Sequence, residues 1–501
     1  VTGTGSSLTM KGNVTVSGNS ISGIVANGTT VKLEDDATVK VDNNGAVAGE
    51  IDNKGSYGIV VKGAAGKFEG TGTTADVKVT TDKSIGLYSE GELTVKKANV
   101  TATEGAINFF AKDGKINING GGTTETGQKS LLFYTSGTGK VVLGGQLDAT
   151  IKGGTTPSTR GTAFYYVSPT RYGAFNTSAI QDYFNNTYGN GTSTLNHLKL
   201  NMEQGSRLFV ASNVGMNLSN TSATNLMTGI TNAPTITGSN YKTFMLYLSK
   251  LTIDQAVDLN DANSSYAQLE IANSSIENAN VMTGSQNRQV AIAQENGNDT
   301  SGNGYNATEV TLTNTASGTI NLTGEESTGI YAKRGLISNA GNISVGKKST
   351  AIYLVEDDRS PATATAGARA VNESTGVITI GEDSTGIFYK VEPDNADGRG
   401  TNTTVGGGIS NDGKIESTAN NVIAMSFDSP YTSKTVKNEQ SGIIDLQGQN
   451  STGIFATGAG TYTATNEGKI ALASSANVNT PNIGMYTDKD TITLENNGTI
   501  E

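Results

Sequence analysis

Alternating apolar and polar residues form short runs that recur along the chain, and each run is followed by a small turn and the motif Ser-Thr-Gly-Ile-aromatic or a close variant. The clearest copy has the run at residues 318–322 and the motif at residues 327–332. Further copies place the motif at 349–353, 384–388 and 451–455, and the step from the first Gly of a copy to its Ser is 9, 8, 8 and 9 residues. Alternation of period two is typical of strands with one buried face. Each copy therefore predicts two short strands joined by a turn.

Repetition of one unit along most of the chain predicts a solenoid. One such unit cannot bury its apolar face alone, so neighbouring units must stack. We predict an all-β, right-handed parallel β-helix with an irregular, partly helical insertion, in which Ile and Val form inner ladders and small residues make the corners. Each turn should use roughly 25 residues. The last half-unit is cut off at residues 496–500, so we expect the chain to be part of a longer parent protein.

The repeat pattern divides the chain into three parts. Looser copies fill residues 1–166, and the sharper copies lie within residues 246–501. Residues 167–245 break the pattern, and within them residues 178–186 predict a short helix, for which Ser178 is the candidate N-cap. We interpret this part as an irregular head on the β-helix. Polar loops are expected at 294–306, 356–370, 391–408 and 428–436.

Composition narrows the class of protein. Gly is 64 of 501 residues, whereas Cys and Trp are absent. A chain without Cys that is rich in Gly, Asn and Thr is typical of a bacterial surface protein that is exported unfolded, because a disulfide would obstruct export. The net charge of −11 disfavours nucleic acid and anionic membranes as partners. No apolar run is long enough for a membrane-spanning helix.

Candidate catalytic and metal-binding residues are few. His197 is the only His, so a His-based triad or a zinc site could form only there, and its setting is a strand start. Residues 341–348 nearly match a phosphate-binding loop, but Lys348 stands where that loop needs Ser or Thr. Residues 394–398 leave a weak surface Ca²⁺ open, although Ala396 occupies a ligand position. We predict no enzymatic activity and no cofactor.

Aromatic residues that follow the repeated Gly-Ile form one set. They should form a ladder if the units stack, and we expect this ladder to be core rather than a sugar platform. Its members are Tyr331, Tyr353, Phe388, Phe455 and Tyr486.

Small residues precede these aromatics. Gly329, Gly386 and Gly453 occupy the position that Ala351 fills in another copy. We therefore attribute the repeated Gly to tight packing against the next unit rather than to a positive φ.

A second set of aromatic and Arg side chains lies where the repeat fails, with Tyr165, Tyr166 and Arg160 nearby. Tyr and Arg are over-represented at interface hot spots. The set therefore predicts a partner-binding site on loops 167–194 and 219–242. The alternative is a small core that packs the insertion onto the solenoid, and the sequence leaves both open. The candidate residues are Arg171, Tyr172, Phe175, Tyr183, Phe184, Tyr188, Arg207 and Tyr241.

The repeats STGI(Y/F) and NxGxI in a Cys-free chain resemble the passenger domains of the large fusobacterial type Va autotransporter adhesins. The resemblance is sharp over residues 300–500 and looser over 10–166. It implies a signal peptide before the passenger and a C-terminal β-barrel in the outer membrane, both outside this chain. It also implies a place on the cell surface, a role in virulence, and adhesion to host receptors with immunoglobulin-like domains, to galactose-containing glycans, or to partner bacteria in coaggregation.

Three classes of function remain to be compared. We expect a non-enzymatic adhesin segment. The alternative is a structural stalk that displays a binding site located elsewhere in the parent protein. A polysaccharide-cleaving β-helix enzyme would need clustered carboxylates or Lys and Arg along one groove, and the sequence contains no such repeated cluster.

Overall fold

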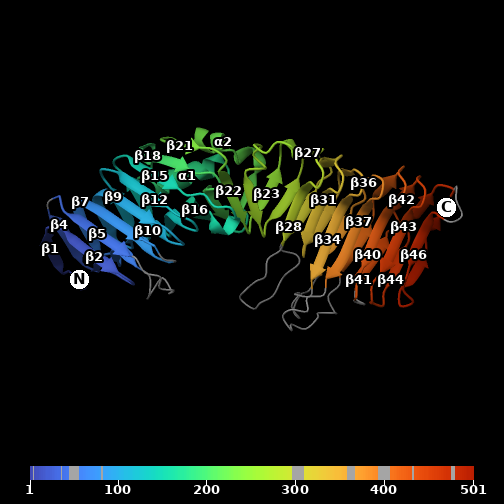
Figure 1. The fold of residues 1–501 in the computed structure, drawn as a ribbon, viewed down its shortest axis with the longest axis horizontal. Coiled ribbons are helices and arrows are strands. Elements are labelled where there is room, and N and C mark those ends of the chain that lie inside the picture. The colour runs from blue at the N-terminus through green and yellow to red at the C-terminus, as the bar shows by residue number, and fades with distance from the viewer. Residues whose placement is uncertain are drawn as a thin grey trace. The chain divides into compact units, whose positions relative to one another are not determined.

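Stacked parallel sheets account for most of this computed structural model, in which 56% of residues are strand and 6% helix (Figure 1). This confirms the all-β parallel β-helix prediction. The structure describes residues 1–3, 5–34, 36–43, 56–80, 83–295, 310–357, 367–392, 407–430, 434–475 and 480–501.

The chain separates into two units. Unit 1 comprises Val1–Met216, Asn220–Leu246 and Gln268–Glu270, and unit 2 comprises Asn217–Ser219, Tyr247–Ala267 and Ile271–Glu501.

Unit 1 contains two long parallel sheets. Sheet 1 has 12 strands, namely β1 (Ser7–Lys11), β2 (Val14–Gly18), β4 (Thr30–Glu34), β5 (Thr38–Asn43), β7 (Lys67–Val79), β9 (Glu92–Ala102), β11 (Lys115–Ile118), β12 (Gly122–Thr126), β14 (Lys140–Leu143), β15 (Leu147–Ile151), β18 (Leu198–Met202) and β21 (Thr235–Gly238). Sheet 2 contains β3 (Ser22–Asn27), β6 (Tyr57–Lys62), β8 (Ile85–Ser89), β10 (Ile107–Lys112), β13 (Leu131–Ser136), β16 (Thr162–Val167), β19 (Arg207–Ser212) and β22 (Lys242–Tyr247). A short pair is formed by β17 (Gly173–Ala174) and β20 (Val214–Asn217), and β25 (Leu269–Ala272) contributes residues to both units.

Unit 2 contains three parallel sheets. Sheet 3 contains β23 (Lys250–Ile253), β26 (Ser275–Asn278), β29 (Thr311–Asn314), β32 (Leu336–Asn339), β35 (Arg369–Asn372), β38 (Gly407–Asn411), β41 (Lys434–Asn438), β44 (Thr463–Asn466) and β47 (Thr493–Asn496). Sheet 4 contains β24 (Val257–Asp258), β27 (Val281–Gly284), β30 (Thr319–Leu322), β33 (Asn342–Val345), β36 (Val377–Ile380), β39 (Lys414–Ser417), β42 (Ile443–Leu446), β45 (Lys469–Leu472) and β48 (Thr499–Ile500). Sheet 5 contains β28 (Val290–Glu295), β31 (Thr328–Lys333), β34 (Thr350–Asp357), β37 (Thr385–Glu392), β40 (Ile423–Asp428), β43 (Thr452–Thr457) and β46 (Ile483–Thr487).

Inner ladders of Ile form the core of unit 2. In sheet 5 the Ile of each motif pairs with an apolar residue of the next strand, as Ile330 does with Ile352 and Ile352 with Ile387. All three of these side chains are fully buried. The predicted inner ladders are therefore confirmed in this unit, and burial of these side chains is its main source of stability.

A ladder of Asn side chains lies beside this core, at the ends of the sheet 3 strands. Each amide nitrogen donates to the side-chain oxygen of the next Asn at 2.7 or 2.8 Å. All members except the last are fully buried, so the ladder satisfies polar groups that water cannot reach. Neighbouring members are separated by 25 to 39 residues, so a turn of unit 2 is often longer than the sequence predicted. The members are Asn278, Asn314, Asn339, Asn372, Asn411, Asn438, Asn466 and Asn496.

The Ser of each motif makes a corner. The Ser349 hydroxyl accepts the backbone N–H of Ser327 at 3.0 Å and donates to the Lys347 carbonyl at 2.9 Å. The residue before it, Lys348, has a φ of 53°. A Ser at this position therefore closes a tight turn and also links two successive turns of the solenoid.

The motif Gly lies against the next turn of the solenoid. A Cβ on Gly386 would lie 2.5 Å from the Ala424 carbonyl oxygen and 3.0 Å from the Ile415 side chain, and the backbone there is not left-handed. Gly329 and Gly453 have the same surroundings. The predicted cause, tight packing rather than a positive φ, is confirmed.

A buried ion pair joins sheets 5 and 3. The Lys434 ammonium lies 2.9 and 2.8 Å from the two carboxylate oxygens of Glu356, and the side chains are only 2% and 4% exposed. The Tyr389 hydroxyl donates to the same carboxylate. Loss of one partner would leave an uncompensated charge inside the protein.

Residues 167–245, apart from Asn217–Ser219, belong to unit 1. Strand β18 pairs with β15, and β19 pairs with β16, in continuous register. Between these strands the segment holds the helices α1 (Thr177–Thr187) and α2 (Ala223–Thr228), with η2 (Leu195–His197) and η3 (Leu218–Asn220), and η1 (Pro157–Thr159) precedes it. Asn176, not Ser178, caps α1, because its side chain accepts the Ala179 N–H at 3.0 Å.

Candidate functional site

The predicted partner-binding residues of the insertion are mostly internal. Phe175, Phe184 and Tyr188 have no exposed surface, and Arg207 is 5% exposed. The Tyr183 hydroxyl donates to the Tyr165 carbonyl at 3.1 Å and lies 3.1 Å from the Tyr188 hydroxyl. For these residues the structure matches the alternative that the sequence left open, a small core, since Phe175, Phe184, Tyr188 and Arg207 are buried and the partly buried Tyr183 is hydrogen-bonded to Tyr188.

This core is larger than the sequence indicated. Phe109, Phe133, Phe164, Phe209 and Phe244 follow one another in sheet 2, with ring centroids 5.4 to 5.8 Å apart. The rings of α1 pack on them, with Phe184 at 5.1 Å from Phe164. In the sequence, the only indication of this stack is that the five Phe residues occupy equivalent positions in their strands.

Burial of this core changes the acidity of its hydroxyl groups. It raises the pKa of Tyr183 to about 12, and it raises the pKa of Tyr188 well above its usual value. Both hydroxyls therefore stay protonated at neutral pH.

The other predicted residues lie nearer the surface. The structure brings Arg171 and Tyr172 together, with the guanidinium 5.0 Å from the ring centroid. Tyr241 is half-buried, and burial raises its pKa. Arg207 forms an ion pair with Glu270. A partner-binding role for Arg171, Tyr172 and Tyr241 stays a prediction.

The repeated aromatics of unit 2 point outward, so our expectation that they form core is wrong. Tyr331, Tyr353, Phe388 and Phe455 are half-buried, and Tyr486 is 45% exposed. The strand pairing passes over the motif Gly, as in the step from Thr328 to Ile330. This places the Ile inside and the next residue, the aromatic, on the outer face of sheet 5.

These side chains form a continuous line, which we call the aromatic column: Tyr331, Tyr353, Phe388, Ser426, Phe455 and Tyr486. Each pairs with the next in register. The ring centroids of Tyr331 and Tyr353 lie 5.6 Å apart, those of Tyr353 and Phe388 5.0 Å, and those of Phe455 and Tyr486 5.7 Å. Ser426 on β40 interrupts the rings once, so a single strand without a ring separates Phe388 from Phe455.

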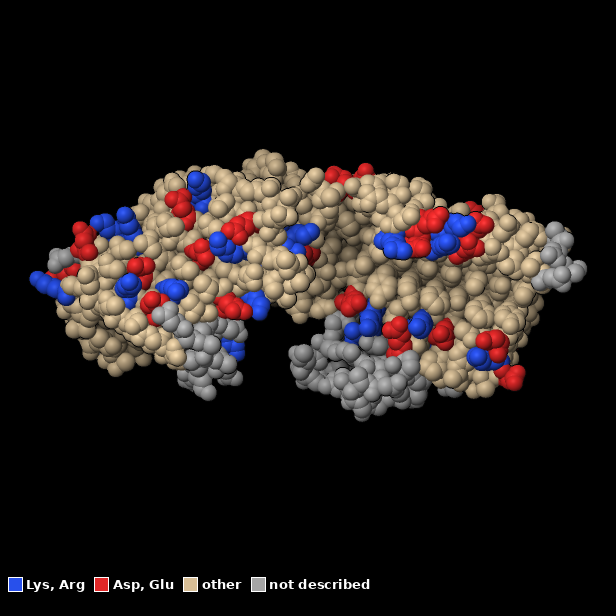
Figure 2. All heavy atoms as spheres, in the orientation of Figure 1, with Lys and Arg blue, Asp and Glu red and all other residues tan. Residues whose placement is uncertain are grey.

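Charged side chains border the aromatic column at both ends of its strands. Figure 2 shows an uncharged band over β34, β37, β40 and β43, with charged groups on either side. Lys347, in the turn before β34, forms an ion pair at 2.7 Å with Glu382 in the neighbouring turn. At the far end of β37, Lys390 and Glu392 form another ion pair at 3.5 Å.

The surroundings also raise the pKa of the column tyrosines. Burial is the main cause for both Tyr331 and Tyr353, and the Glu295 carboxylate adds to the effect at Tyr331. Their hydroxyls therefore remain donors at neutral pH.

A hollow of about 470 Å³ opens at the first end of the column. Tyr331 forms one wall, and Ala293, its register partner on β28, lies beside it. Asn273, Gln294 and Glu295 supply polar groups to the lining. The column and this hollow together present rings, amides and a carboxylate to solvent, an arrangement suited to binding.

The structure also places other sequence candidates. His197 is half-buried in η2. Gly341 begins the segment that resembles a phosphate-binding loop. It packs against the previous turn, where a Cβ on Gly341 would lie 2.2 Å from the Gly318 carbonyl oxygen. The possible Ca²⁺ segment 394–398 lies outside the described residues. Within the described ranges, no group of three or more His, Cys, Asp or Glu could hold a metal ion.

No protein-family model, curated protein or solved structure matches this chain. Across the described parts of the chain, no helix combines the length and the apolar character needed to cross a membrane.

Proposed function

We propose that this chain is a non-enzymatic segment of a bacterial cell-surface adhesin, and that unit 2 binds a host glycan along the aromatic column. The observation that carries this proposal is the column itself, a line of solvent-facing rings on a sheet whose other face holds the core. The motif resemblance to autotransporter passenger domains supports the cell-surface location.

Physical reasons favour an extended, repeating ligand. Contiguous apolar patches rimmed by polar groups mark interaction sites. Successive strands in a sheet lie about 4.8 Å apart, so the column presents a ring at each step along one line except at Ser426. A saccharide chain offers a similar series of flat, weakly polar ring faces beside hydroxyl groups. The hydroxyls of Tyr331 and Tyr353 and the charged borders can accept or donate hydrogen bonds to those groups.

The structural stalk remains the second candidate. The internal Asn ladder favours it, because such a ladder stabilises a scaffold whether or not the outer face binds anything. In that case the outer aromatics would serve only to pack against each other across the sheet.

Alanine replacements in the column separate the two candidates. We expect the double variant Tyr353→Ala and Phe388→Ala to lose at least about 2 kcal/mol of binding free energy, roughly thirtyfold in Kd, as hot-spot truncations do. The matched control is Tyr134→Ala, which removes a half-buried outward ring of unit 1 that contacts Phe110 at 4.6 Å.

Binding is measured with the whole chain on a glycan array, on host cells and on soluble receptors with immunoglobulin-like domains. Circular dichroism checks that each variant is folded. Equal binding by the double variant and the parent, to every one of these targets, would leave the stalk as the better account. Loss of receptor binding without loss of glycan binding would replace the glycan by a protein ligand.

A further inference from the structure

A hollow of about 660 Å³ lies in unit 1, separate from the residues assigned above. Its walls include Arg160, Lys242, Thr155 and Asn240, together with backbone at Gly154 and Gly205. No aromatic side chain lines it, so its surface is suited to a polar ligand. Its volume is in the range of sites that hold small molecules.

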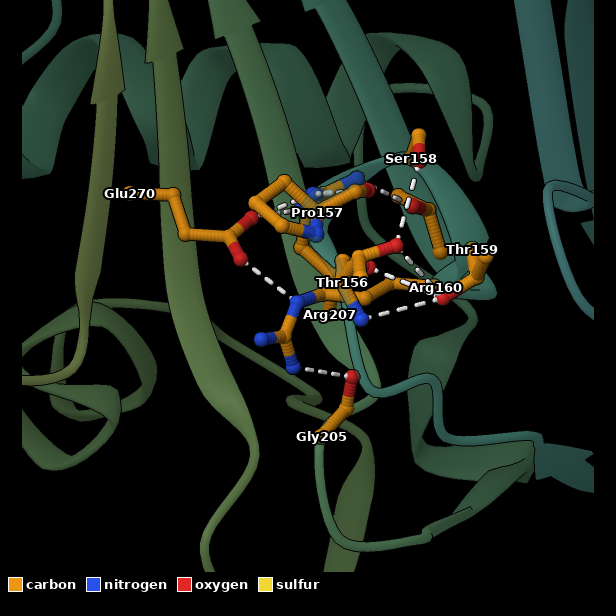
Figure 3. A network of polar contacts seen from close by, with 9 residues as sticks. Thr156, Pro157, Ser158, Thr159, Arg160, Gly205, Arg207 and Glu270 are labelled. Carbon is orange, nitrogen blue, oxygen red and sulfur yellow. Dashed lines mark hydrogen bonds and ion pairs between the residues drawn. The ribbon is translucent and has the colours of Figure 1, made fainter.

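A buried carboxylate, that of Glu270, holds the lining residue Arg160 in place. Glu270 on β25 lies 2.5 Å from the Arg160 Nε and accepts from the Arg207 Nε at 2.8 Å (Figure 3). Arg207 also donates to the Pro157 carbonyl at 3.0 Å, and Arg160 donates through Nη1 to the Gly205 carbonyl at 2.6 Å. The Arg160 and Glu270 side chains are 12% and 10% exposed, so these contacts hold Arg160 firmly in place.

Positive charge exceeds negative charge beside the hollow, because Arg160 and Arg207 both contact the one carboxylate of Glu270. The pKa of Lys242 is lowered, mainly by burial; Arg160 adds to this, and Glu270 opposes it. Glu203 at the rim lies 2.9 Å from the Lys152 ammonium, which also lies 3.5 Å from Glu125.

Donors remain available inside the hollow. Among the described residues, the second terminal nitrogen of Arg160, Nη2, has no hydrogen-bond partner (Figure 3). The side chains of Thr155 and Asn240 likewise make no hydrogen bond within the part of the chain that the structure describes. Gly205 keeps the space open, since its φ is +75° and a Cβ there would lie 2.9 Å from the Arg160 Nη1.

We propose that this hollow binds an acidic saccharide, with its carboxylate or sulfate group held between Arg160 and Lys242. A guanidinium that is already oriented by other contacts gives strong, charge-assisted hydrogen bonds to such oxyanions. Thr155 and Asn240 then serve the sugar hydroxyls. The site belongs to unit 1 and does not depend on the aromatic column.

Calorimetry on the whole chain tests this site with three probes: glucuronate, glucose 6-sulfate and neutral glucose. We expect saturable binding of at least one acidic probe, none of glucose, and weaker binding as salt is raised. The ratio between the two acidic probes identifies the preferred oxyanion.

Variants assign the binding to the hollow. Lys242→Met should weaken the acidic probe at least tenfold, whereas Lys242→Arg, which keeps the charge, should retain most of the affinity. Lys242 is preferred to Arg160 because Arg160 contacts the buried Glu270 carboxylate and the Gly205 carbonyl, so its loss would disturb the fold. Circular dichroism checks that each variant is folded. Absence of saturable binding to the folded parent overturns the proposal, and so does equal affinity in parent and Lys242→Met.

Discussion

Replacement of Asn372 by Ala removes the middle of the Asn ladder. The Asn372 side chain accepts from the Asn339 amide at 2.7 Å and donates to the Asn411 oxygen at 2.8 Å. It also donates to the carbonyls of Gly376 at 3.2 Å and Lys414 at 3.3 Å. All of the three Asn side chains are fully buried, so water cannot replace the lost contacts.

The expected cost follows from the groups left without partners. Asn372→Ala leaves one amide N–H group of Asn339 and the side-chain oxygen of Asn411 unsatisfied, and each such group costs about 1–3 kcal/mol. We therefore expect a loss of about 4 kcal/mol in the free energy of unfolding of unit 2. Asn496→Ala is the matched control. Asn496 is exposed and accepts one bond from Asn466 at 2.7 Å, so its loss should cost about 1 kcal/mol or less.

The assay must be local, because a chain with two units need not unfold in one transition. Hydrogen exchange followed by mass spectrometry on peptides from β32, β35 and β38 gives the opening free energy near the replaced residue. Urea unfolding by circular dichroism gives the overall effect. If Asn372→Ala keeps the protection of the parent, or loses no more than Asn496→Ala, then the ladder does not stabilise unit 2.

Three further variants test packing, charge and pH. Gly386→Val should lower the melting temperature more than Gly386→Ala, since the added groups meet the Ala424 carbonyl; equal melting temperatures would count against this. Lys434→Met should cost about 3–5 kcal/mol by leaving Glu356 charged and unpaired, and the double variant with Glu356→Gln should recover part of that loss in urea unfolding. The folded-state pKa of Tyr183, about 12, lies above its unfolded value, so its stabilisation is complete below about pH 10 and is lost as pH rises towards about 12. This amounts to about 3 kcal/mol; Tyr183→Phe should show a shallower alkaline fall in melting temperature, and identical slopes would refute the assignment.

Local pattern was enough to predict the strands of the repeats. In the run before the motif, apolar Ile320 and Leu322 alternate with polar residues and are buried as the pattern predicts. Ile330 and Ile352 lie in the predicted inner ladder. The attribution of the repeated Gly to tight packing is also confirmed. It could be made from the sequence because Ala351, at the equivalent position, excludes a requirement for positive φ. In both cases the information lies within a few residues of the motif.

The orientation of the aromatics could not be read in the same way. Tyr331 directly follows Ile330, and the sequence alone does not show that Gly329 is passed over in the pairing, which decides the face of every later residue. Contacts across long separations were also hidden. Arg160 and Glu270 form an ion pair because the stacked strands from β16 to β25 bring these distant segments together. No residue near either one in the sequence predicts this contact.

The Asn ladder has a consequence for how such chains evolve. The side-chain nitrogen of each member lies 2.7 to 2.8 Å from the side-chain oxygen of the next, although 25 to 39 residues separate the two in the chain. Extra residues between strands therefore leave the pairing unaltered, and the entropic cost of a longer connection grows slowly. Genes for these chains can gain or lose codons between strands while the scaffold is preserved. Such sites are also the natural places to insert foreign epitopes for display, with the neighbouring strands as a constant frame.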